Sequence, residues 1–298
     1  MSTTTESFLV GLIGTGVVPS LTPPMHEREA DRQGLRYLYR PLDLEVMGRA
    51  PEEVGDILRE AGRLGFNACN ITSPVKELAV AHLDTMSPQV RSLGATNTVL
   101  IRDGKLHGEN TDVTGFGEAF DQRMQGAPRE RVVLFGAGGA GSAVATALLE
   151  AGVRELSIVD VAVERAQERA ERLAGIAAER GAEVTGQGSD AVAALLADAD
   201  GVVNATFMGM HNHPGTPFDL DLLRPEHWVA DIVYRPVRTR LVEQATRLGC
   251  RILDGGHMAC GQAIDAFRLI TGRPADAAAV RSDFDALIRA EAMTGGAE

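Results

Sequence analysis

Short apolar runs alternate along the chain with longer stretches in which apolar residues recur every three or four positions. Runs of the first kind are typical of buried strands, and stretches of the second kind are typical of helices that cover a sheet. In the first part of the chain, strands are expected at 8–14, 66–71, 97–102 and 106–108, and helices at 51–64 and 74–82. This alternation predicts one α/β unit over the first ~110 residues.

A second series of strands and helices follows a helix expected from Val113 to about Met124. Its strands are expected at 131–135, 156–159, 182–184, 201–204, 228–232 and 250–253. Further helices are expected at 142–149, about 260–269 and 275–292. Two α/β domains joined near residue 113 are the simplest arrangement that this pattern allows.

Composition and charge narrow the classes of partner. The chain has 298 residues, of which 44% are hydrophobic and 23% charged, as in ordinary globular proteins. Its 29 basic and 41 acidic side chains give a net charge of −12. A charge this negative argues against nucleic acid or a membrane surface as the main partner, whereas a small anionic ligand still fits a locally positive cleft.

The three cysteines, Cys69, Cys250 and Cys260, form no CxxC pair. They predict neither a zinc site nor a disulfide framework, so we expect reduced thiols, no metal and a cytoplasmic protein. The apolar run near the N-terminus lacks a basic flank and is broken by glycines, unlike a signal peptide. No stretch reaches the ~18 apolar residues that a membrane span needs.

A glycine-rich turn links an expected strand to an expected helix at 136–141. Gly136, Gly138 and Gly141 match the GxGxxG pattern in the strand–turn–helix context that gives it meaning. The first glycine permits the tight turn, the second lets the backbone approach a pyrophosphate, and the third lets the helix pack on the strand. Because the N-terminus of the helix also favours phosphate, the pattern predicts a Rossmann dinucleotide-binding domain.

The next expected strand ends in Asp160, where a carboxylate can bind the hydroxyls of the adenosine ribose. A 2′-phosphate there would meet like charge, so Asp160 favours NAD over NADP. Arg165 follows shortly after and could stack near the adenine or bind a phosphate, which keeps NADP open. An aspartate that only caps the following helix is the structural alternative.

Lys76 closes the segment Asn-Ile-Thr-Ser-Pro-Val-Lys at 70–76, between a strand and an expected helix. The chain otherwise draws its basic residues from arginine, and Lys105 is the only other lysine. Arginine does not release its proton, whereas lysine can serve as a catalytic acid or base. The alternative, a solvated surface lysine, is weakened by this preference for arginine.

Two polar clusters, 94–98 and 108–112, flank the expected hairpin. Asn–Thr pairs at strand ends commonly form turns. Their repetition in both arms, with Asp112 at the entrance to the next helix, predicts polar groups that converge on a polyol.

Together these segments resemble the shikimate dehydrogenase family over nearly the whole chain. The resemblance rests on GLIG at 11–14, SLTPPMH at 20–26, NITSPVK at 70–76, GATNT at 94–98, GENTD at 108–112, GAGGAG at 136–141, NATFMGM at 204–210, DIVYRPVRT at 231–239 and DGGHMACGQAIDAF at 254–267. It implies an α/β protein with an N-terminal α/β substrate-binding and catalytic domain at 1–113, joined by the C-terminal helices 258–298, and a Rossmann NAD-binding domain at 114–257.

The resemblance also implies roles for individual residues. Lys76 and Asp112 correspond to the catalytic pair of the family. The implied substrate-binding residues are Ser20 and Thr22 for the carboxylate, Thr72, Asn97, Asn110 and Gln262 for ring hydroxyls, and Tyr234. The implied cofactor-binding residues are Gly136, Ala137, Gly138, Gly139, Ala140, Gly141, Asp160, Arg165, Asn204, Ala205, Thr206, Met208, Val233, Gly255 and Met258.

Two departures from the family pattern narrow the subgroup. Thr22 stands where the family usually has a second serine, and Asp160 stands where NADP-dependent members begin an Asn-Arg-Thr phosphate-binding stretch. Both are similar to the NAD-dependent quinate/shikimate dehydrogenases of actinobacteria. The implied activity is reversible NAD-linked oxidation of the C3 hydroxyl of quinate and shikimate, in a monomer or homodimer without a nucleic-acid or membrane partner.

Three alternatives stay open on the sequence. They are an NADP-dependent biosynthetic shikimate dehydrogenase, an aminoshikimate dehydrogenase, and a non-catalytic regulator that binds quinate or shikimate. Phe207 replaces the usual proline of the family's NATP stretch, and the sequence assigns it no role.

Overall fold

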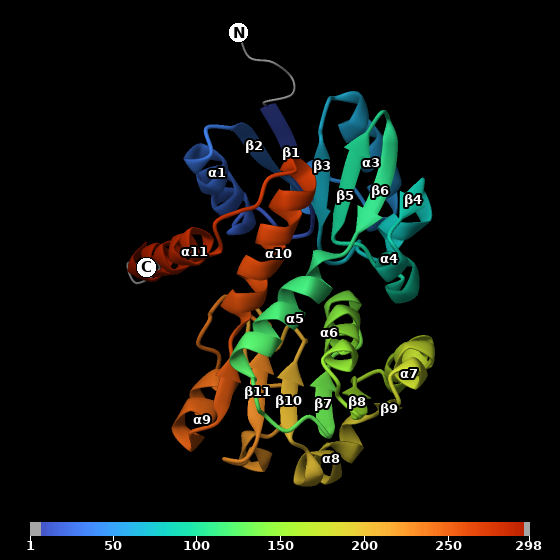
Figure 1. Cartoon of the computed structure of the whole chain (residues 1–298), viewed down its shortest axis with the longest axis vertical. Helices are drawn as coiled ribbons and strands as arrows, with labels where there is room; N and C mark the ends of the chain where they lie inside the picture. The colour runs from blue at the N-terminus through green and yellow to red at the C-terminus, as the bar shows by residue number, and fades with distance from the viewer. Residues whose placement is uncertain (1–6, 295–298) are drawn as a thin grey trace. The chain divides into compact units, whose positions relative to one another are not determined.

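The computed structural model describes residues 7–294, and its internal contacts divide the chain into two compact units. The first unit comprises the residues through Thr111 together with those from Cys260 onward, and the second unit comprises Asp112–Ala259. Each unit is built on its own sheet, as Figure 1 shows. The expected α/β fold class is therefore confirmed.

Within the described residues, the first unit holds a six-stranded sheet in the order β2-β1-β3-β5-β6-β4. Its strands are β1 (Ser7–Gly14), β2 (Arg36–Asp43), β3 (Ala68–Ile71), β4 (Thr85–Met86), β5 (Thr98–Arg102) and β6 (Lys105–Glu109). Strand β1 is parallel to β2 and β3, whereas β5 is antiparallel to β3 and β6. The ends of β1, β3 and β6 and the start of β5 consequently meet at one edge of the sheet.

Helices cover both faces of this first sheet. Helix α3 (Val54–Arg63) packs on one face with the side chains of Ile13 and Ile71, while Val10 and Leu12 point to the other face and pack with Phe267. The alternation along β1 buries both faces, as the apolar run at 8–14 indicates. The remaining helices of the unit are α1 (Thr22–Arg32), α2 (Leu44–Met47), α4 (Pro88–Leu93), α11 (Ala277–Thr294) and, from Cys260 onward, α10 (Gly255–Thr271).

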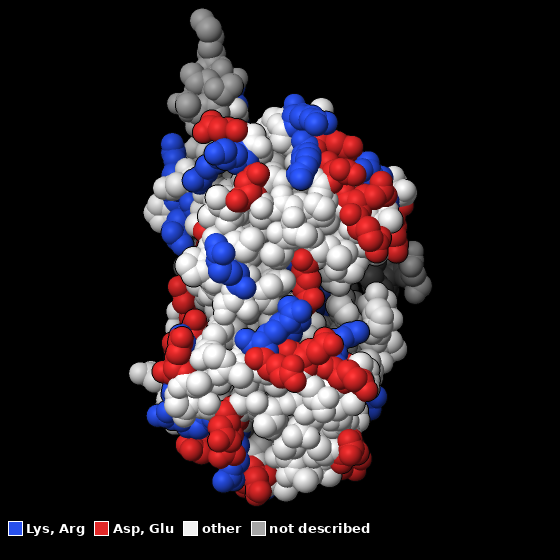
Figure 2. Space-filling view, turned by 90° about the vertical axis from the view of Figure 1, so that its right-hand side faces the viewer, with Lys and Arg blue, Asp and Glu red and all other residues white. Residues whose placement is uncertain are grey.

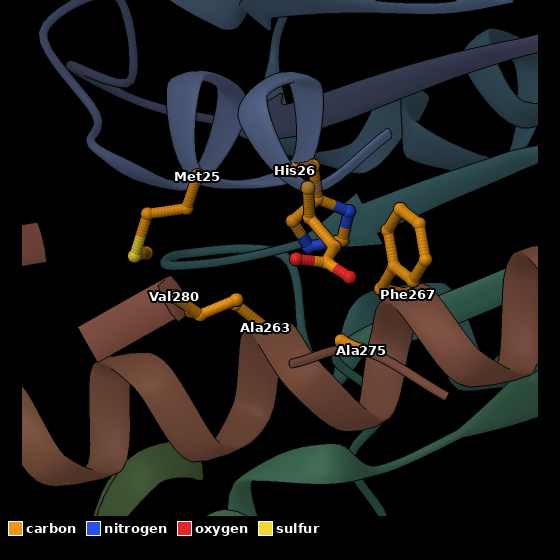
Figure 3. Close-up of a pocket in the computed structure, with 7 residues that line it drawn as sticks. Met25, His26, Ala263, Phe267, Ala275 and Val280 are labelled. Carbon is orange, nitrogen blue, oxygen red and sulfur yellow. The ribbon is translucent and has the colours of Figure 1, made fainter. Parts of the chain in front are cut away.

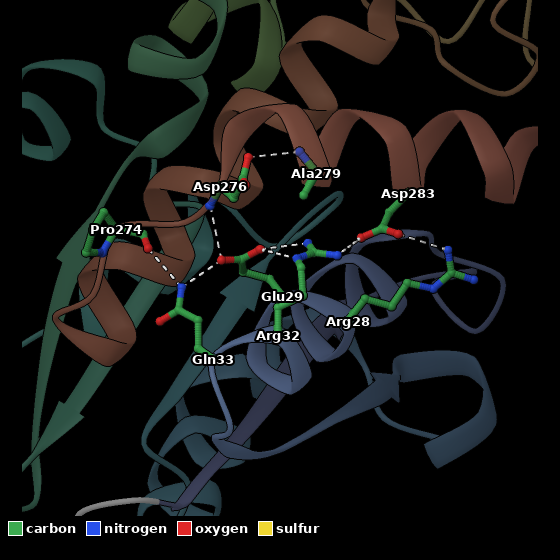
Figure 4. Close-up of polar contacts among 8 residues, drawn as sticks. All are labelled: Arg28, Glu29, Arg32, Gln33, Pro274, Asp276, Ala279 and Asp283. Atoms are coloured by element: carbon green, nitrogen blue, oxygen red, sulfur yellow. Dashed lines mark hydrogen bonds and ion pairs between the residues drawn. The ribbon is translucent and has the colours of Figure 1, made fainter.

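The buried carboxylate of Glu29 fastens α1 to the start of α11 (Figure 4). It accepts hydrogen bonds from the side chains of Arg32 and Gln33 and from the backbone N–H of Asp276. Asp283 on α11 forms ion pairs with Arg28 and Arg32. These contacts join segments that lie far apart in the sequence within one unit.

His26 lies in the seam between α1, α10 and α11, next to Phe267 and Val280 (Figure 3). Its Nδ1 is 2.9 Å from the hydroxyl of Tyr37, and its Nε2 has no hydrogen-bond partner among the described residues. The seam is too narrow to admit a water molecule. Burial lowers the pKa of His26 to about 3, so the ring is neutral at physiological pH.

The second unit holds, within the described residues, a six-stranded parallel sheet in the order β12-β11-β10-β7-β8-β9. Its strands are β7 (Arg131–Phe135), β8 (Glu155–Val159), β9 (Glu183–Gln187), β10 (Gly201–Asn204), β11 (Trp228–Asp231) and β12 (Arg251–Leu253). Its helices are α5 (Thr111–Arg123), α6 (Gly139–Glu150), α7 (Val163–Glu179), α8 (Val192–Asp198) and α9 (Arg240–Leu248). The strand order reverses between β7 and β10, which is where open α/β sheets bind their ligands.

The helix expected at 74–82 is wrong, because only a short 3₁₀ turn at Leu78–His82 forms there. The backbone carbonyls of Ser73 and Lys76 accept hydrogen bonds from the N–H groups of Thr15 and Thr96. A regular helix would use both carbonyls internally. Long-range contacts of this kind are invisible to a local pattern.

Among the elements of the first unit that the sequence pattern missed are the strand β2 and the helix α1; the short elements α2, β4 and α4 were missed as well. In β2 the buried Tyr37 and Tyr39 alternate with exposed residues, but Pro41 obscures the strand. Proline is tolerated there because β2 is an edge strand. Helix α1 opens with two prolines, which occupy the first turn and therefore cost it no internal hydrogen bond.

Acidic and basic side chains are interspersed on the face of the protein that Figure 2 displays. None of the described helices is long and apolar enough to cross a membrane.

Candidate functional site

Polar residues gather at the edge of the first sheet where β3 and β6 end and β5 begins. Thr72 follows β3, Asn97 precedes β5, and Asn110 follows β6. The register pairs Asn70 with Thr98, and Thr98 with Glu109, so these segments are neighbours across the sheet. Three residues that the resemblance assigns to the substrate therefore share one edge.

Asn97 is the centre of a hydrogen-bond network at this edge. Its Oδ1 accepts from the backbone N–H of Thr111 at 2.7 Å, and its Nδ2 donates to the Thr111 hydroxyl at 3.0 Å. Asn70 donates to the Thr98 hydroxyl at 2.9 Å and accepts from Tyr39. Because Asn97 is only 3% exposed, these bonds fix the turn that leads from β6 into α5.

The backbone that carries Lys76 is held by the same edge. The N–H of Thr96 donates to the carbonyl of Lys76 at 3.0 Å, and the hydroxyl of Thr96 donates to the carbonyl of Glu109 at 2.7 Å. Asn110 donates to the carbonyl of Ala95 at 3.0 Å. The half-buried side chain of Lys76 thus starts from a fixed point beside the polar clusters.

Ser20 and Thr22 lie at the start of α1, and both are half-buried. The Ser20 hydroxyl accepts from the N–H of Thr22 at 3.2 Å. The preceding loop is held by Asp43, which accepts from the N–H groups of Val17 and Val18 at 2.7 and 3.3 Å. Burial works to raise the pKa of Asp43, but these backbone hydrogen bonds bring it below its ordinary value.

Several contributors to this edge were missed on the sequence. Asn70, Thr98 and Thr111 hold the network, and the only signal for them was their place in the two polar clusters and the 70–76 segment. Asp43 is the last residue of β2, a strand that the sequence pattern did not reveal.

Gln262 joins the first unit through α10. Its backbone carbonyl accepts from the Thr111 hydroxyl at 3.1 Å, so α10 returns to the turn after β6. Asp112 and Tyr234 belong to the second unit, where Asp112 stands in the first turn of α5 and Tyr234 follows β11.

The glycine-rich turn of the second unit joins β7 to α6. Gly136 has a φ of +103°, and a Cβ at Gly141 would lie 1.9 Å from the carbonyl oxygen of Gly136. A Cβ at Gly138 would meet no heavy atom within 4 Å. The turn therefore needs Gly136 and Gly141 for its own shape, whereas Gly138 borders open space at the N-terminus of α6, the position at which Rossmann domains in general bind a pyrophosphate.

Asp160 stands at the end of β8 beside this turn. Its carboxylate accepts from the N–H of Ala137 at 2.9 Å and from the N–H of Ala162, the residue that precedes α7, at 3.0 Å. The helix-start role considered on the sequence is thus present, together with a contact to the glycine turn. A carboxylate has about four acceptor positions, so it can still accept ribose hydroxyls.

Two arginines of α7 behave differently. Arg165 is exposed, whereas Arg169 is 6% exposed and donates from Nε to the carbonyl of Ala137 at 3.2 Å. Sequence reasoning missed Arg169. The available signal was its position on the buried face of α7, between Ala166 and Ala170.

The other residues assigned to the cofactor lie at the same edge of the second sheet. Asn204 ends β10, and the others follow β10 (Ala205, Thr206 and Met208), β11 (Val233) and β12 (Gly255 and Met258). A Cβ at Gly255 would lie 2.4 Å from the carbonyl oxygen of Val233, so glycine permits the close approach of these two segments. The C-terminal ends of parallel strands are where a dinucleotide binds.

Residues 7–294 contain no group of three His, Cys, Asp or Glu side chains that could hold a metal ion. The three cysteines are buried and form no disulfide with one another.

Comparison with known proteins identifies the family. The model of the shikimate dehydrogenase substrate binding domain matches residues 12–99, and that of shikimate / quinate 5-dehydrogenase matches residues 118–210. A curated relative, the shikimate dehydrogenase (NADP(+)) of Pseudarthrobacter chlorophenolicus, is 56% identical over 98% of this chain and 99% of its own length. The chain belongs to the shikimate dehydrogenase family. The resemblance drawn from the sequence is confirmed.

Relatives within the family differ in the cofactor that their names state. The quinate/shikimate dehydrogenase (NAD(+)) of Corynebacterium glutamicum strain R is 44% identical over 94% of this chain and 98% of its own length. The structure of quinate dehydrogenase from Corynebacterium glutamicum in complex with NAD has a TM-score of 0.86 at 44% identity, covering 94% of this chain and 99% of that one.

These comparisons confirm the Rossmann-like second domain and the class of enzyme. The chain is an NAD(P)-dependent oxidoreductase that acts on CH–OH groups, of the shikimate/quinate dehydrogenase type.

Proposed function

We propose that this chain is a cytoplasmic quinate/shikimate dehydrogenase that uses NAD. It reversibly oxidises the C3 hydroxyl of quinate to 3-dehydroquinate and that of shikimate to 3-dehydroshikimate. The observation that carries the proposal is the edge of the first sheet, where the fixed backbone of Lys76 adjoins the Asn97–Thr111 network. Amide and hydroxyl groups suit a substrate with several hydroxyls.

Lys76 is the proposed proton acceptor during oxidation. When bound, the nicotinamide dinucleotide supplies the hydride acceptor. The neutral amine of Lys76 takes the hydroxyl proton in the forward direction and returns it in the reverse direction. The proposed role of Asp112 is to orient Lys76 and to accept a hydrogen bond from a ring hydroxyl. Because the neutral amine is required, oxidation rates are expected to rise toward alkaline pH.

The remaining polar residues hold the substrate in this proposal. The hydroxyls of Ser20 and Thr22 bind the carboxylate, while Thr72, Asn110 and Gln262 bind ring hydroxyls. Asn97 also contributes, because its amide uses one N–H on Thr111 and has a second to donate to a ligand. Tyr234 is a further contact near the substrate.

The preference for NAD rests on Asp160. Its carboxylate lies at the end of β8, where an adenosine 2′-phosphate would meet like charge. The second candidate is an NADP-dependent enzyme, which is favoured by Arg165 and Arg169 on α7 and by the name of the 56% identical relative.

Initial rates at pH 9 with quinate and with shikimate, each with NAD and with NADP, test the proposal. Turnover of both substrates with NAD is the expected result. Turnover of shikimate only, and with NADP only, would replace the NAD-dependent enzyme by the second candidate. If no combination turns over but quinate still raises the melting temperature, the chain is a non-catalytic binding protein. A panel extended to aminoshikimate covers the remaining alternative.

A further inference from the structure

The second unit contains a buried carboxylate that the proposed chemistry does not use. Asp231 ends β11 and is 1% exposed. Its Oδ1 accepts from the side-chain amide of Asn204 at 2.9 Å and from the N–H of Val233 at 3.0 Å. Its Oδ2 accepts from the hydroxyl of Thr239 at 2.6 Å. A carboxylate this deeply buried is costly, since burial raises the pKa of Asp231 to about 6 in spite of these bonds.

One branch of this network shapes the segment after β10. Asn204, itself fully buried, donates to Asp231 and to the carbonyl of Met208 at 3.0 Å. Its Oδ1 accepts from both the N–H and the hydroxyl of Thr206, and the Thr206 hydroxyl accepts from the N–H of Met208. The orientation of the Asn204 amide, and with it the segment 204–208, therefore depends on the acceptor at Asp231.

The other branch shapes the segment after β11. The bond to Val233 fixes the chain just before Tyr234, and Thr239 caps α9 by accepting from the N–H of Val242. The two segments also touch, because Gly209 packs closely against the side chain of Thr239. Asp231 is thus the shared acceptor of two neighbouring loops.

The order of the strands indicates which half of a dinucleotide would contact the loops after β10 and β11. The glycine turn follows β7, and Asp160 marks the adenosine side at β8. Strands β10 and β11 lie on the opposite side of β7. A dinucleotide whose pyrophosphate lies on the glycine turn therefore extends its nicotinamide half over the ends of β10 and β11.

We infer that Asp231 is a positioning residue, which shapes the 204–208 and 231–239 loops to receive the nicotinamide half of the cofactor. The inference rests on the dinucleotide orientation of the proposed function. According to this inference, the binding of the adenosine half depends only on Asp160 and the glycine turn. Loss of Asp231 should accordingly weaken the binding of the whole dinucleotide without weakening the binding of its adenosine half.

Two ligands separate the halves: NADH, which carries both, and ADP-ribose, which lacks nicotinamide. In Asp231→Ala we expect the NADH dissociation constant to rise by about tenfold or more, with that of ADP-ribose within about twofold of wild type. A fall in kcat should accompany the loss of NADH affinity. The matched control is Asp200→Ala, because Asp200 also joins two strands by accepting from the N–H groups of Glu130 and Arg131, but at the opposite edge of the same sheet. It should change neither dissociation constant.

A gentler variant covers the case in which Asp231→Ala does not fold. Thr239→Val removes the hydroxyl bond to Oδ2 together with the cap that Thr239 gives to α9, and it should weaken NADH binding in the same direction but less. Thr239→Ser keeps a hydroxyl for both bonds and should bind NADH as wild type does. Equal losses for NADH and ADP-ribose, or unchanged NADH binding in both variants, would overturn the inference. If wild type itself binds neither ligand, the proposed function fails instead.

Discussion

The two units place their functional groups at the same kind of sheet edge but build them from different parts of the chain. In the first unit the edge is made of side chains, chiefly asparagine and threonine, that are bonded to one another around Asn97. In the second unit it is largely backbone, a glycine turn and two loops whose shapes depend on the carboxylates of Asp160 and Asp231. Substitutions should therefore affect chemistry and substrate choice in the first unit and cofactor affinity in the second.

The largest expected effect is the loss of activity when Lys76 is replaced. Replacing Lys76 by alanine should lower kcat for quinate oxidation by about 10²–10⁴-fold, the usual contribution of a general base. Steady-state rates in wild type and variant give the ratio. Lys105→Ala is the matched control, because Lys105 is exposed in the β6 hairpin and should leave kcat unchanged. Equal losses in both variants would remove the special role of Lys76.

Within the glycine turn, Gly138 is expected to matter for cofactor binding and Gly141 for folding. Gly138→Val adds a side chain to open space and should leave the melting temperature unchanged. It should weaken NADH binding by roughly 10²-fold, since losing two backbone bonds to a charged phosphate costs about 3 kcal/mol. Gly141→Ala should instead lower the melting temperature, because its Cβ clashes with Gly136. Thermal unfolding together with NADH titration checks both, and destabilisation by Gly138→Val would contradict this division.

The pH dependence of stability should differ in sign between two buried groups. Burial lowers the pKa of His26 to about 3 from 6.5, so the unfolded chain binds the proton first and stability is lost as pH falls below 6.5. Burial raises the pKa of Asp231 to about 6 from 3.8, so the folded chain binds the proton first and stability is gained as pH falls toward 3.8. Between pH 7 and pH 5, His26 should lower the free energy of unfolding by about 2 kcal/mol, and Asp231 should raise it by about 1 kcal/mol.

Hydrogen exchange resolved by unit, in wild type, His26→Gln and Asp231→Asn at both pH values, measures these effects. With His26→Gln, the first unit should no longer lose stability between pH 7 and pH 5. With Asp231→Asn, the second unit should no longer gain stability over the same range. Variants are needed because burial also lowers the pKa of His227 in the second unit, which opposes Asp231. If either variant keeps the pH dependence of wild type, that dependence arises from other groups and the prediction for the replaced residue is wrong.

The smallest expected effect is on Thr22. Thr22→Ser removes one methyl group next to the proposed carboxylate site. The ratio of kcat/KM for quinate to kcat/KM for shikimate should change by a factor that corresponds to at most about 1–3 kcal/mol of transition-state free energy. The ratio is sensitive because quinate is tetrahedral at C1, whereas shikimate is planar there. Thr246→Ser in α9 serves as the control. An unchanged ratio would show that Thr22 does not discriminate between the substrates.

The strands of the second unit were more predictable from sequence than those of the first, although the helices α7, α8 and α9 were not predicted. Strands β7 and β10 are short buried runs rich in valine, and the glycine pattern and Asp160 directly follow β7 and β8, so a short stretch of sequence is enough to interpret them. In the first unit the edge strand β2 is interrupted by Pro41, and Asn97 meets Thr111 only because β5 and β6 pair. Arg169 and Asp231 were missed because their roles lie in contacts with distant backbone or side chains.

One titration tests the division between the two units most directly: NADH into Lys76→Ala and Gly138→Val under the same conditions. The account expects Lys76→Ala, although nearly inactive, to bind NADH as wild type does, and Gly138→Val to lose most of its NADH affinity while remaining folded. Parallel loss of NADH affinity in Lys76→Ala, or wild-type affinity in Gly138→Val, would contradict it.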